Sequence, residues 1–409
     1  MSKKKIMIIG AGDFQLPLVQ KASESYQVIL VAPKVDSVFA PYITEKFLID
    51  VRNQEEILEF AKQQKIDGVI TDQTDIAVRT VAYVAEQMGL PGIGYETAKL
   101  FTDKSLMRKK LHELDIPQLP NKTVFSLEEA RDYYRKLGGS VIIKPLDTQG
   151  SRGVQACHTE EELISKFAEA ARWSSNGSVI VERLATGREF VVEGMALNNK
   201  FQNLICGDTL YFDMPDAFAA KNRIFPSNAD SGLVQRVLDL NEKIVTGFGL
   251  KQGISHSEYI MDGDEIYLME TAARGGGVFI SSDLISLSTG LCTEEFLLNI
   301  ATGQQDEFPE ISDQKCFCGY MAFYIPVGCV VALNAIEDVQ NLDYVHRNQL
   351  NNLFIGKTIT SGHTDKTSRL AIIVSAPSRD LLRQRMENIK SILRVEVETE
   401  DGKKGLIWE

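Results

Sequence analysis

The sequence predicts a mixed α/β and α+β protein built from several structural units. Its 409 residues suffice for two to four units around a sizeable core. Strand and helix patterns alternate over the first ~95 residues, which is typical of a parallel α/β layer. Beyond them, strands and helices follow in a less regular order, and no internal repeat occurs. With 44% hydrophobic and 24% charged residues, the composition is that of a globular protein.

The N-terminal unit is predicted to be a small doubly wound domain. Its strands are expected at Lys5–Ile9, Gln27–Val31 and Gly68–Thr71, and its helices at Leu16–Ser25, Gln54–Gln64 and Ile76–Met88. Gly10-Ala11-Gly12 follows the first strand and begins like a dinucleotide fingerprint. Position 15, however, is Gln instead of the third glycine, and Lys34 follows the second strand instead of an acidic residue. NAD binding is therefore disfavoured, and the glycines are expected to let a helix start close to the strand.

A helical pattern from Tyr95 to Leu114 carries Asp103-Lys104 and ends before two prolines, which marks a boundary. A second unit begins near Thr123. It is expected to contain a helix capped by Ser126, a strand at Ser140–Pro145, a helix at Thr159–Trp173 and a strand at Ser178–Leu184.

A polar loop follows the strand that ends in Lys144. It contains Gly150, Ser151, Arg152 and Gly153, and the strand pattern resumes from Val154 to Cys157. Glycines let backbone N–H groups approach phosphate oxygens, and lysine and arginine add charge, so the loop has the features of a cover over a polyphosphate. It is not a Walker A loop, and a plain hairpin with a glycine turn is the alternative.

Two carboxylates flank the next turn. Glu182 ends one strand and Glu189 begins another across a glycine-containing turn. They are either hydrogen-bonding groups for an amine edge and a pair of hydroxyls, or surface carboxylates.

The stretch from Gly253 to Gly277 is predicted to be a β-hairpin that carries a metal site. A three-residue turn after Asp262 would place Glu258 opposite Glu270. Facing carboxylates repel unless a cation compensates them, and oxygen ligands suit Mg²⁺. Arg274 and three glycines follow at once. The alternative is an exposed hairpin end with two solvated glutamates.

The rest of the chain supplies a large core. Helices are expected at Ser231–Phe248, Asp283–Leu287, Thr293–Thr302 and Ser378–Leu393, and strands at Phe317–Ile325, Cys329–Leu333, Leu353–Phe354, Arg369–Ser375 and Val395–Val397. Lys221 and Arg223 are interpreted as solvated surface charge, and a position near a phosphate or a substrate is the alternative. His256 shares a strand face with Glu258 and is either a packed strand histidine or a pocket residue.

Composition excludes several classes of protein. The net charge of -12 argues against a nucleic-acid-binding surface. The apolar run Ile6–Ile9 is too short for a signal peptide, and no stretch is long enough to span a membrane, so a cytoplasmic protein is expected. Six scattered cysteines predict free thiols, and Cys316, Cys318 and Cys329 lack a fourth zinc ligand.

These motifs, in this order, resemble the ATP-grasp superfamily, and most closely its branch with biotin carboxylase, carbamoyl phosphate synthetase and the L-amino-acid ligases. The resemblance covers nearly the whole chain and rests on Gly10-Ala11-Gly12, Asp103-Lys104, Ile143-Lys144-Pro145, Val181-Glu182-Arg183-Leu184, Glu258, Glu270 and Arg274–Gly277. It implies a Rossmann-like pre-ATP-grasp domain (1–98), a connecting helix (99–122), a mobile lid (123–186), a catalytic core (187–312) and a C-terminal α+β subdomain (313–409).

The resemblance also implies residue roles. Lys104, Lys144 and the loop with Gly150, Ser151, Arg152 and Gly153 would contact ATP phosphates, Glu182 and the backbone at Leu184 would read adenine, Glu189 would hold the ribose, Glu258 and Glu270 would hold one or two Mg²⁺ or Mn²⁺ ions, and Arg274 would contact the acyl-phosphate or the substrate carboxylate. Lys144 and Arg274 are the catalytic candidates.

The implied reaction is ATP-dependent joining of a small carboxylic acid to an amine through an acyl-phosphate, with release of ADP and phosphate. A purine-biosynthetic ligase or carboxylase of the glycinamide-ribonucleotide type is the alternative. A silent nucleotide-binding protein is another, because Ala272 stands where the family often has a metal-binding Asn. The biotin carboxylase branch is often dimeric, so a homodimer is one expected state.

Overall fold

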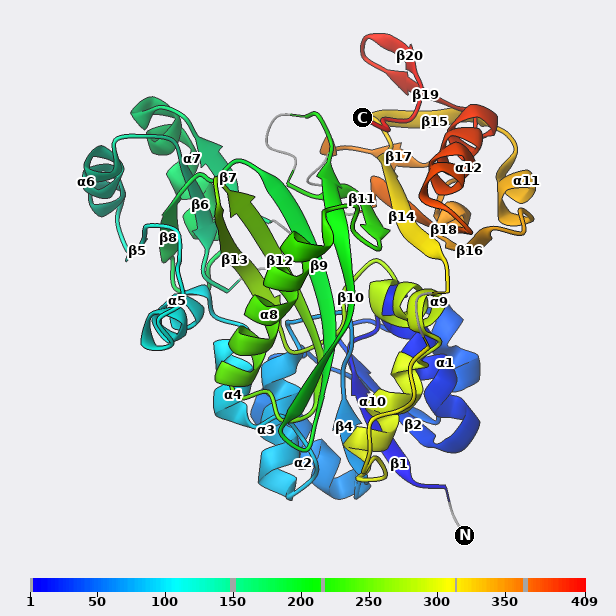
Figure 1. The fold of residues 1–409 in the computed structure, drawn as a ribbon. Helices are drawn as coiled ribbons and strands as arrows, with labels where there is room; N and C mark the ends of the chain where they lie inside the picture. The colour runs from blue at the N-terminus through cyan, green and yellow to red at the C-terminus, as the bar shows by residue number, and fades with distance from the viewer. Residues whose placement is uncertain (1–2, 148–151, 215–217, 313–314, 363–366) are drawn as a thin grey trace.

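The computed structural model describes residues 3–147, 152–214, 218–312, 315–362 and 367–409. Gly150 and Ser151, which the sequence assigns to the phosphate loop, lie outside these described residues. A central sheet joins a blue N-terminal domain, a teal unit at the upper left and an orange-red C-terminal unit at the upper right (Figure 1). The mixed α/β and α+β fold predicted from the sequence is confirmed.

The N-terminal domain is a parallel sheet with helices on both faces. The order is β3 (Glu45–Leu48), β2 (Gln27–Ala32), β1 (Lys5–Ile9) and β4 (Gly68–Ile70). The domain's helices are α1 (Leu16–Ser25), α2 (Gln54–Gln64) and α3 (Val78–Met88). Ile6 and Ile8 pack with α1 and with α10 (Thr293–Ala301), whereas Met7 and Ile9 pack with α2 and α3. Because α10 comes from later in the chain, it fixes this domain to the rest of the molecule.

Two helices connect the first domain to the next unit, so the prediction of one helix from Tyr95 to Leu114 is wrong. They are α4 (Tyr95–Leu100) and α5 (Lys104–Glu113). The Asp103 side chain caps α5, because it accepts hydrogen bonds from Ser105 N at 2.9 Å and Leu106 N at 3.1 Å. This cap begins a new helix and fixes Lys104 in its first turn.

The second unit is an antiparallel sheet with helices on one face. The order is β5 (Asn121–Val124), β8 (Val179–Arg183), β6 (Val141–Pro145) and β7 (Gln155–Cys157), and α6 (Leu127–Leu137) and α7 (Glu160–Arg172) cover it. Val141, Ile143 and Val181 pack against the helices. Since side chains alternate along a strand, Lys144 and Glu182 point to the opposite face.

The central sheet has eight strands, drawn from most of the second half of the chain. The order is β13 (Glu265–Ala272), β12 (Gly253–Asp262), β9 (Arg188–Leu197), β10 (Lys200–Tyr211), β11 (Ala220–Phe225), β14 (Phe317–Tyr324), β18 (Arg369–Ala376) and β16 (Val345–Asn348). The helix α8 (Ser231–Gly247) packs on β9, β10 and β12. A π-helical turn η3 (Ile280–Leu284) and α9 (Ile285–Thr289) precede α10. The C-terminal strands therefore extend the same sheet that carries the hairpin.

A smaller sheet completes the C-terminal unit. It runs β17 (Thr358–Ile359), β15 (Gly328–Leu333), β19 (Val395–Thr399) and β20 (Gly402–Lys404), beside α11 (Ile336–Gln340) and α12 (Arg379–Ile392). The predicted strand Leu353–Phe354 is wrong: both residues lie in an irregular link between a short helix and a turn, where Leu353 is buried and Phe354 is exposed. Apolar residues without alternation do not by themselves specify a strand.

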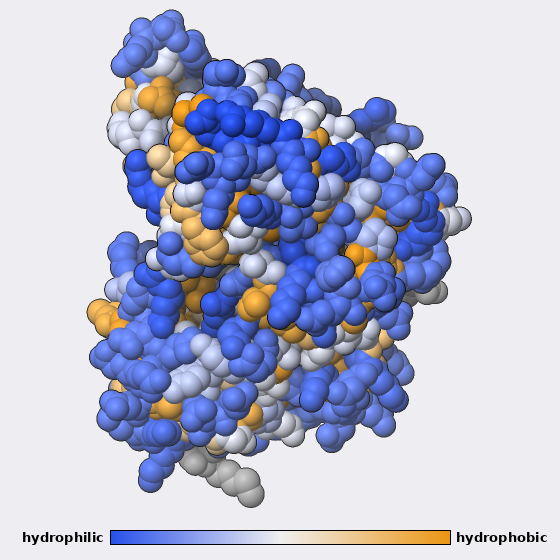
Figure 2. All heavy atoms as spheres, turned by 90° about the vertical axis from the view of Figure 1, so that its left-hand side faces the viewer, coloured by the Kyte–Doolittle hydropathy of each residue, from blue (hydrophilic) through white to orange (hydrophobic). Residues whose placement is uncertain are grey.

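The surface shows no large apolar area on the side toward β5 and α6. Figure 2 shows that this face is mostly hydrophilic, with hydrophobic residues in small separate groups. Among the residues that the structure describes, no helix combines the length and apolar character needed to cross a membrane.

Candidate active site

A cavity of about 500 Å³ lies where the second unit, the central sheet and α5 meet. That volume falls in the range of small-molecule pockets. Seven of the residues singled out in the sequence line it, namely Lys104, Lys144, Leu184, Glu189, Glu258, Glu270 and Arg274. They come from four strands, two loops and one helix, spread from position 104 to position 274, so the fold brings them together.

The hairpin β12–β13 places its two glutamates opposite each other. Glu258 pairs with Glu270 in the strand register, as predicted. The predicted three-residue turn is wrong, because Asp262 pairs with Glu265 across a two-residue turn. An irregularity in register between Glu258 and Tyr259 shifts the pairing by one residue and restores the facing glutamates.

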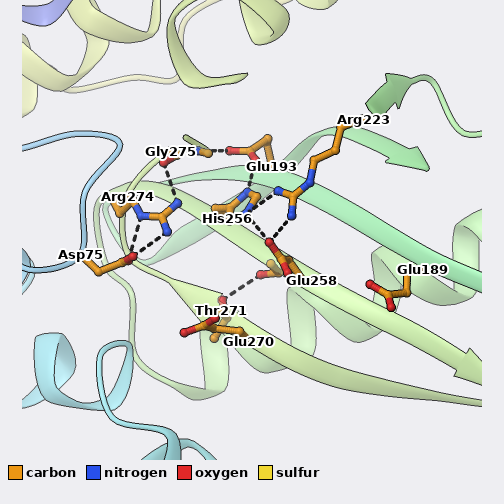
Figure 3. A network of polar contacts seen from close by, with 12 residues as sticks. Asp75, Glu189, Glu193, Arg223, His256, Glu258, Glu270, Thr271, Arg274 and Gly275 are labelled. Atoms are coloured by element: carbon orange, nitrogen blue, oxygen red, sulfur yellow. Dashed lines mark hydrogen bonds and ion pairs between the residues drawn. The ribbon is translucent and has the colours of Figure 1, made fainter. Parts of the chain in front are cut away.

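Glu258 lies in a network of charged side chains (Figure 3). Arg223 from β11 donates to its carboxylate, and His256 Nε2 lies 3.1 Å from Glu258 Oε1. The other ring nitrogen of His256 contacts Glu193. Burial alone would raise the pKa of Glu258, but Arg223 and His256 lower it below its ordinary value. The carboxylate is therefore held charged, as a metal or cation ligand must be.

Glu270 has a different cationic partner. Lys104 Nζ lies 3.0 Å from Glu270 Oε1, and the Glu270 side chain remains 39% exposed to the cavity. The two facing glutamates offer hard oxygen donors, which fit Mg²⁺ or Mn²⁺ bound together with phosphate oxygens. Ala272 lines the same cavity and adds no ligand atom. The two carboxylates could hold a divalent ion only together with oxygen atoms of phosphate or water, because the described residues contain no group of three or more His, Cys, Asp or Glu side chains that could hold a metal ion.

Lys144 and Glu182 belong to a buried ion-pair cluster. Glu182 Oε2 lies 2.7 Å from Lys144 Nζ, and its Oε1 lies 2.5 Å from Arg108 Nε of α5. Burial would raise the pKa of Glu182, but Arg108 and Lys144 lower it to about 2. Both carboxylate oxygens are thus engaged, and Lys144 is oriented at the cavity wall by a fixed charge beneath it.

Glu189 lies on the same side of the sheet as Glu258. Tyr211 donates its hydroxyl to Glu189 Oε2 at 2.6 Å. Burial and the nearby charge of Glu258 raise the pKa of Glu189, against the opposing effect of that hydrogen bond. Leu184, just beyond β8, contributes an apolar wall.

Arg274 is anchored by the N-terminal domain. Its Nε and Nη2 donate to the two oxygens of Asp75 at 2.8 and 2.6 Å, which is a bidentate pair (Figure 3). Gly276, two residues on, has its N–H 2.9 Å from Glu193 Oε2. A Cβ at Gly276 would lie 2.6 Å from Glu193 Oε1 and 2.9 Å from His256 Nδ1. The glycine therefore lets this backbone pack against the network of Glu258.

The described end of the proposed phosphate loop packs on α7. The Arg152 guanidinium lies 5.7 Å from the centre of the Trp173 ring. Gly153 has a φ of +72°, and a Cβ there would lie 2.7 Å from the Trp173 side chain. These two loop residues are thus fixed beside Val154, which lines the cavity.

Part of the chain matches a known domain family. Residues 137–283 match the model of the ATP-grasp domain. The chain contains an ATP-grasp domain. That span includes Lys144, both facing glutamates and Arg274, and it ends inside η3.

Solved structures resemble the whole chain and show the same fold. The L-amino acid ligase from Bacillus licheniformis superimposes with a TM-score of 0.83 at 20% identity, covering 98% of this chain and 100% of that one. The phosphoribosylglycinamide synthetase from Anaerococcus prevotii gives 0.73 at 18%, covering 96% and 99%. A biotin carboxylase domain from Hydrogenobacter thermophilus, solved with MgADP and bicarbonate, gives 0.78 at 17%, covering 99% and 92%.

Among curated sequences, the carbamoyl phosphate synthase large chain of Clostridium perfringens is 22% identical over 337 residues. The match spans 76% of this chain and only 31% of that protein, so this chain covers about a third of its length.

Sequence reasoning misjudged Arg223 in the ATP-grasp domain. The prediction that it is solvated surface charge is wrong, because it is 9% exposed, lines the cavity and binds Glu258. Its neighbour Lys221 pairs with Glu409. Simple alternation along β11 does not place Arg223, because the pairing of β11 with β10 is irregular beside Lys221, between the partners of Leu210 and Tyr211. His256 turns out to be both buried, at 5% exposure, and a lining residue of the cavity.

The glycine loop after β1 is closed by its own side chain. Gln15 Oε1 accepts from Gly12 N at 2.8 Å, and Gln15 Nε2 donates to Asp72 O at 3.0 Å. The backbone N–H that would face a phosphate in a dinucleotide fold is therefore already bonded. The two hydrogen bonds of Gln15 fix the loop to the segment after β4, and the expectation that the loop does not hold NAD stays a prediction.

Proposed function

We propose that this chain is an ATP- and Mg²⁺-dependent carboxylate–amine ligase that works through an acyl-phosphate. The single observation that carries the proposal is the meeting of Glu258 and Glu270 with Lys104, Lys144 and Arg274 in one cavity of an ATP-grasp fold. Facing carboxylates supply oxygen ligands, and the three cations supply charge for phosphates and for a substrate carboxylate.

In this proposal, Lys104 and Lys144 bind the phosphates of ATP, and Arg152 and Gly153 lie at the described end of the loop that covers them. Leu184 and the backbone beside it contact adenine. The Glu182 carboxylate is already bound by Arg108 and Lys144. Glu182 is therefore proposed to contribute to nucleotide binding by holding these two side chains in position. Glu189 is proposed to accept a hydrogen bond from the ribose.

Glu258 and Glu270 would hold the divalent ion, Mg²⁺ or Mn²⁺, which supplies charge neutralisation between phosphate groups. Arg223 and Lys104 already balance these carboxylates, so they stand next to the place where the γ-phosphate would lie. Arg274 would orient the reacting carboxylate. Its guanidinium is fixed by Asp75 and by the carbonyl of Gly275, and each terminal nitrogen keeps one further hydrogen that could be donated to a ligand.

The proposed reaction has two displacements. A carboxylate oxygen of the acid attacks the γ-phosphorus, the bond from that phosphorus to the β–γ bridging oxygen breaks, and ADP leaves. The amine nitrogen then attacks the acyl carbon, the bond to phosphate oxygen breaks, and the nitrogen loses a proton. Positioning and charge neutralisation suffice for both steps, and closure of the cavity around the bound substrates would keep water from the acyl-phosphate.

A glycinamide-ribonucleotide-type ligase or carboxylase is the second candidate. The full-length structural match to phosphoribosylglycinamide synthetase favours it, although that match is lower than the one to the L-amino acid ligase. The two candidates differ in the acceptor or acid they require, which is either a free amino acid or a ribose-phosphate compound.

Phosphate release from ATP tests the proposal. The full chain is incubated with ATP and Mg²⁺, and with pairs from a panel of small acids, amino acids and phosphoribosylamine-type compounds. Release that requires both members of one pair, with the joined product found by mass spectrometry, supports the ligase and selects the candidate. Tight ATP binding with no release across the panel would instead identify a silent nucleotide-binding protein.

We further propose a cytoplasmic location and a homodimer. The six cysteines are free thiols, which suits a reducing compartment. The biotin carboxylase domain from Hydrogenobacter thermophilus was solved as a dimer. Light scattering of the purified chain distinguishes a dimer from a monomer.

A further inference from the structure

Among the described residues, six lysine and arginine side chains line the cavity, and five of them are paired with a carboxylate. The pairs are Lys104 with Glu270, Lys144 with Glu182, Arg183 with Asp262, Arg223 with Glu258 and Arg274 with Asp75. The sixth, Arg369, has no carboxylate partner among the residues that the structure describes.

Arg369 is held in place by neutral groups. It begins β18, half-buried, and its guanidinium lies 5.6 Å from the centre of the Tyr320 ring. One terminal nitrogen donates to the carbonyl of Ala220, while the buried Nε has no hydrogen-bond partner. Tyr320 pairs with Arg223 across β14 and β11, so Arg369 and the charged network border the same part of the cavity.

A guanidinium with a buried N–H that has no hydrogen-bond acceptor is costly to desolvate. An anion that accepts hydrogen bonds from it would offset this cost. Its planar donors match a carboxylate in a bidentate geometry. We propose that Arg369 binds a substrate carboxylate that is not the one phosphorylated, so that one substrate is an α-amino acid or a dicarboxylic acid. That the bound carboxylate belongs to a substrate rests on the proposed ligase function. That a carboxylate binds at Arg369 rests on the cavity alone.

Such a carboxylate has two sources. It is either the α-carboxylate of an amino-acid substrate or the second carboxylate of an acidic substrate. Amide analogues separate them, because an amide keeps the shape of a carboxylate and removes its charge. L-Alanine against L-alaninamide probes the first source, and L-glutamate against L-glutamine, with L-aspartate against L-asparagine, probes the second.

Binding of these probes to the full chain with MgADP present is measured by calorimetry. The wild-type protein is expected to bind the carboxylate member of at least one pair about tenfold or more tightly than its amide, as a charged hydrogen bond contributes. Arg369→Gln is expected to remove that preference. Arg369→Lys, which keeps the charge but loses the planar fork, is expected to retain part of it.

Arg383→Gln is the matched control, because this arginine lies on α12 of the same C-terminal unit, is 76% exposed and pairs with Asp380 within its helix. It is expected to bind every probe as the wild type does. Circular dichroism and MgADP binding test whether each variant is folded. If Arg369→Gln does not fold, a weaker preference of Arg369→Lys for the carboxylate over its amide is the deciding result.

Three results would overturn the inference: a wild-type protein that binds none of the carboxylate probes, a preference unchanged in the Arg369 variants, or an equal loss in Arg383→Gln. The outcome is separate from the ligase proposal. A carboxylate preference that depends on Arg369, without phosphate release, would support carboxylate binding by Arg369 and contradict the ligase function. Phosphate release without that preference would support the ligase function and contradict carboxylate binding by Arg369.

Discussion

Glu258 and Glu270 face each other across neighbouring strands, yet each carboxylate is paired with a cation from a different element. Arg223 reaches Glu258 from β11, and Lys104 reaches Glu270 from α5. Repulsion between the two glutamates is therefore already offset within the protein. A divalent ion that binds between the glutamates would lie beside the positive charges of Arg223 and Lys104. Anionic phosphates would balance this excess of positive charge, so metal and nucleotide are expected to bind together.

Replacing Glu270 should stop turnover without unfolding the protein. Glu270→Gln removes one proposed metal ligand while keeping the size of the side chain, and its 39% exposure keeps the cost to stability small. Phosphate release is expected to fall about 100-fold or more, because the metal supplies several kcal/mol of charge stabilisation. Mg²⁺ titration of nucleotide binding should show a weaker metal dependence.

The control is Glu265→Gln, at the exposed start of the same strand. It should leave phosphate release within twofold or so of wild type, as surface changes usually do. Turnover of Glu270→Gln close to that of the control would sink the metal assignment.

Lys144 is predicted to act on both nucleotide binding and stability. Lys144→Met leaves Glu182 with Arg108 as its remaining cation, so the free energy of unfolding should drop by about 1–3 kcal/mol. ATP affinity should fall about tenfold or more. The double variant with Glu182→Gln should recover part of the stability and none of the affinity.

Denaturant unfolding and equilibrium nucleotide binding measure the two effects. Lys136→Met, on the exposed surface of α6, is the matched control and should change neither. Unchanged ATP affinity in Lys144→Met would count against a phosphate contact, whatever happens to stability.

Acid should weaken the fold through Glu182. The folded pKa of this carboxyl is lowered from 4.5 to about 2, so its stabilising contribution is complete above the unfolded pKa. That contribution, a few kcal/mol, is lost as the pH falls from about 4.5 toward about 2. Urea unfolding followed across this window should show stability declining with pH.

Glu182→Gln provides the comparison for the acid effect. The variant should be less stable near neutral pH, because Arg108 and Lys144 lose their shared partner. Its deficit should shrink as the pH falls, since protonation neutralises Glu182 in the wild type too. Two unfolding curves that remain parallel across the window would contradict the lowered pKa.

Two adjacent glycines should respond differently to alanine. A Cβ at Gly276 would lie 2.6 Å from Glu193 Oε1, whereas a Cβ at Gly277 would meet nothing within 4 Å. Gly276→Ala should therefore cost about 1–3 kcal/mol of stability, and Gly277→Ala should change the melting temperature little. Differential scanning calorimetry of the pair tests this, and equal melting temperatures would refute it.

The sequence predicted the order of most elements well, because alternation and capping are local signals. Turn length was harder: a three-residue turn was expected in the hairpin, and an irregular pairing near Tyr259 compensates for the shorter one. Glu258 still faces Glu270, so the predicted pair was right although the predicted turn was not. Bulges depend on neighbouring strands, which a single segment does not reveal.

The ion-pair partners of Glu258 and Arg274 were the part that sequence reasoning could not supply. Arg223 lies 35 residues from Glu258, and Asp75 lies 199 residues from Arg274. No periodicity within one element points to either contact. Only the strand order, which places β11 and the N-terminal domain around the hairpin, brings these residues together.

The side chain of Gln15 has a wider consequence for engineering this molecule. It ties Gly12 to the carbonyl of Asp72, and the Asp72 carboxylate in turn accepts the N–H of Gly275, next to Arg274. The first turn of the chain is thus linked by three hydrogen bonds to the arginine proposed to orient the acid. A chimera that exchanges the N-terminal domain for that of a relative would have to keep Gln15 and Asp72. Without their hydrogen bonds, the orientation of Arg274 would change.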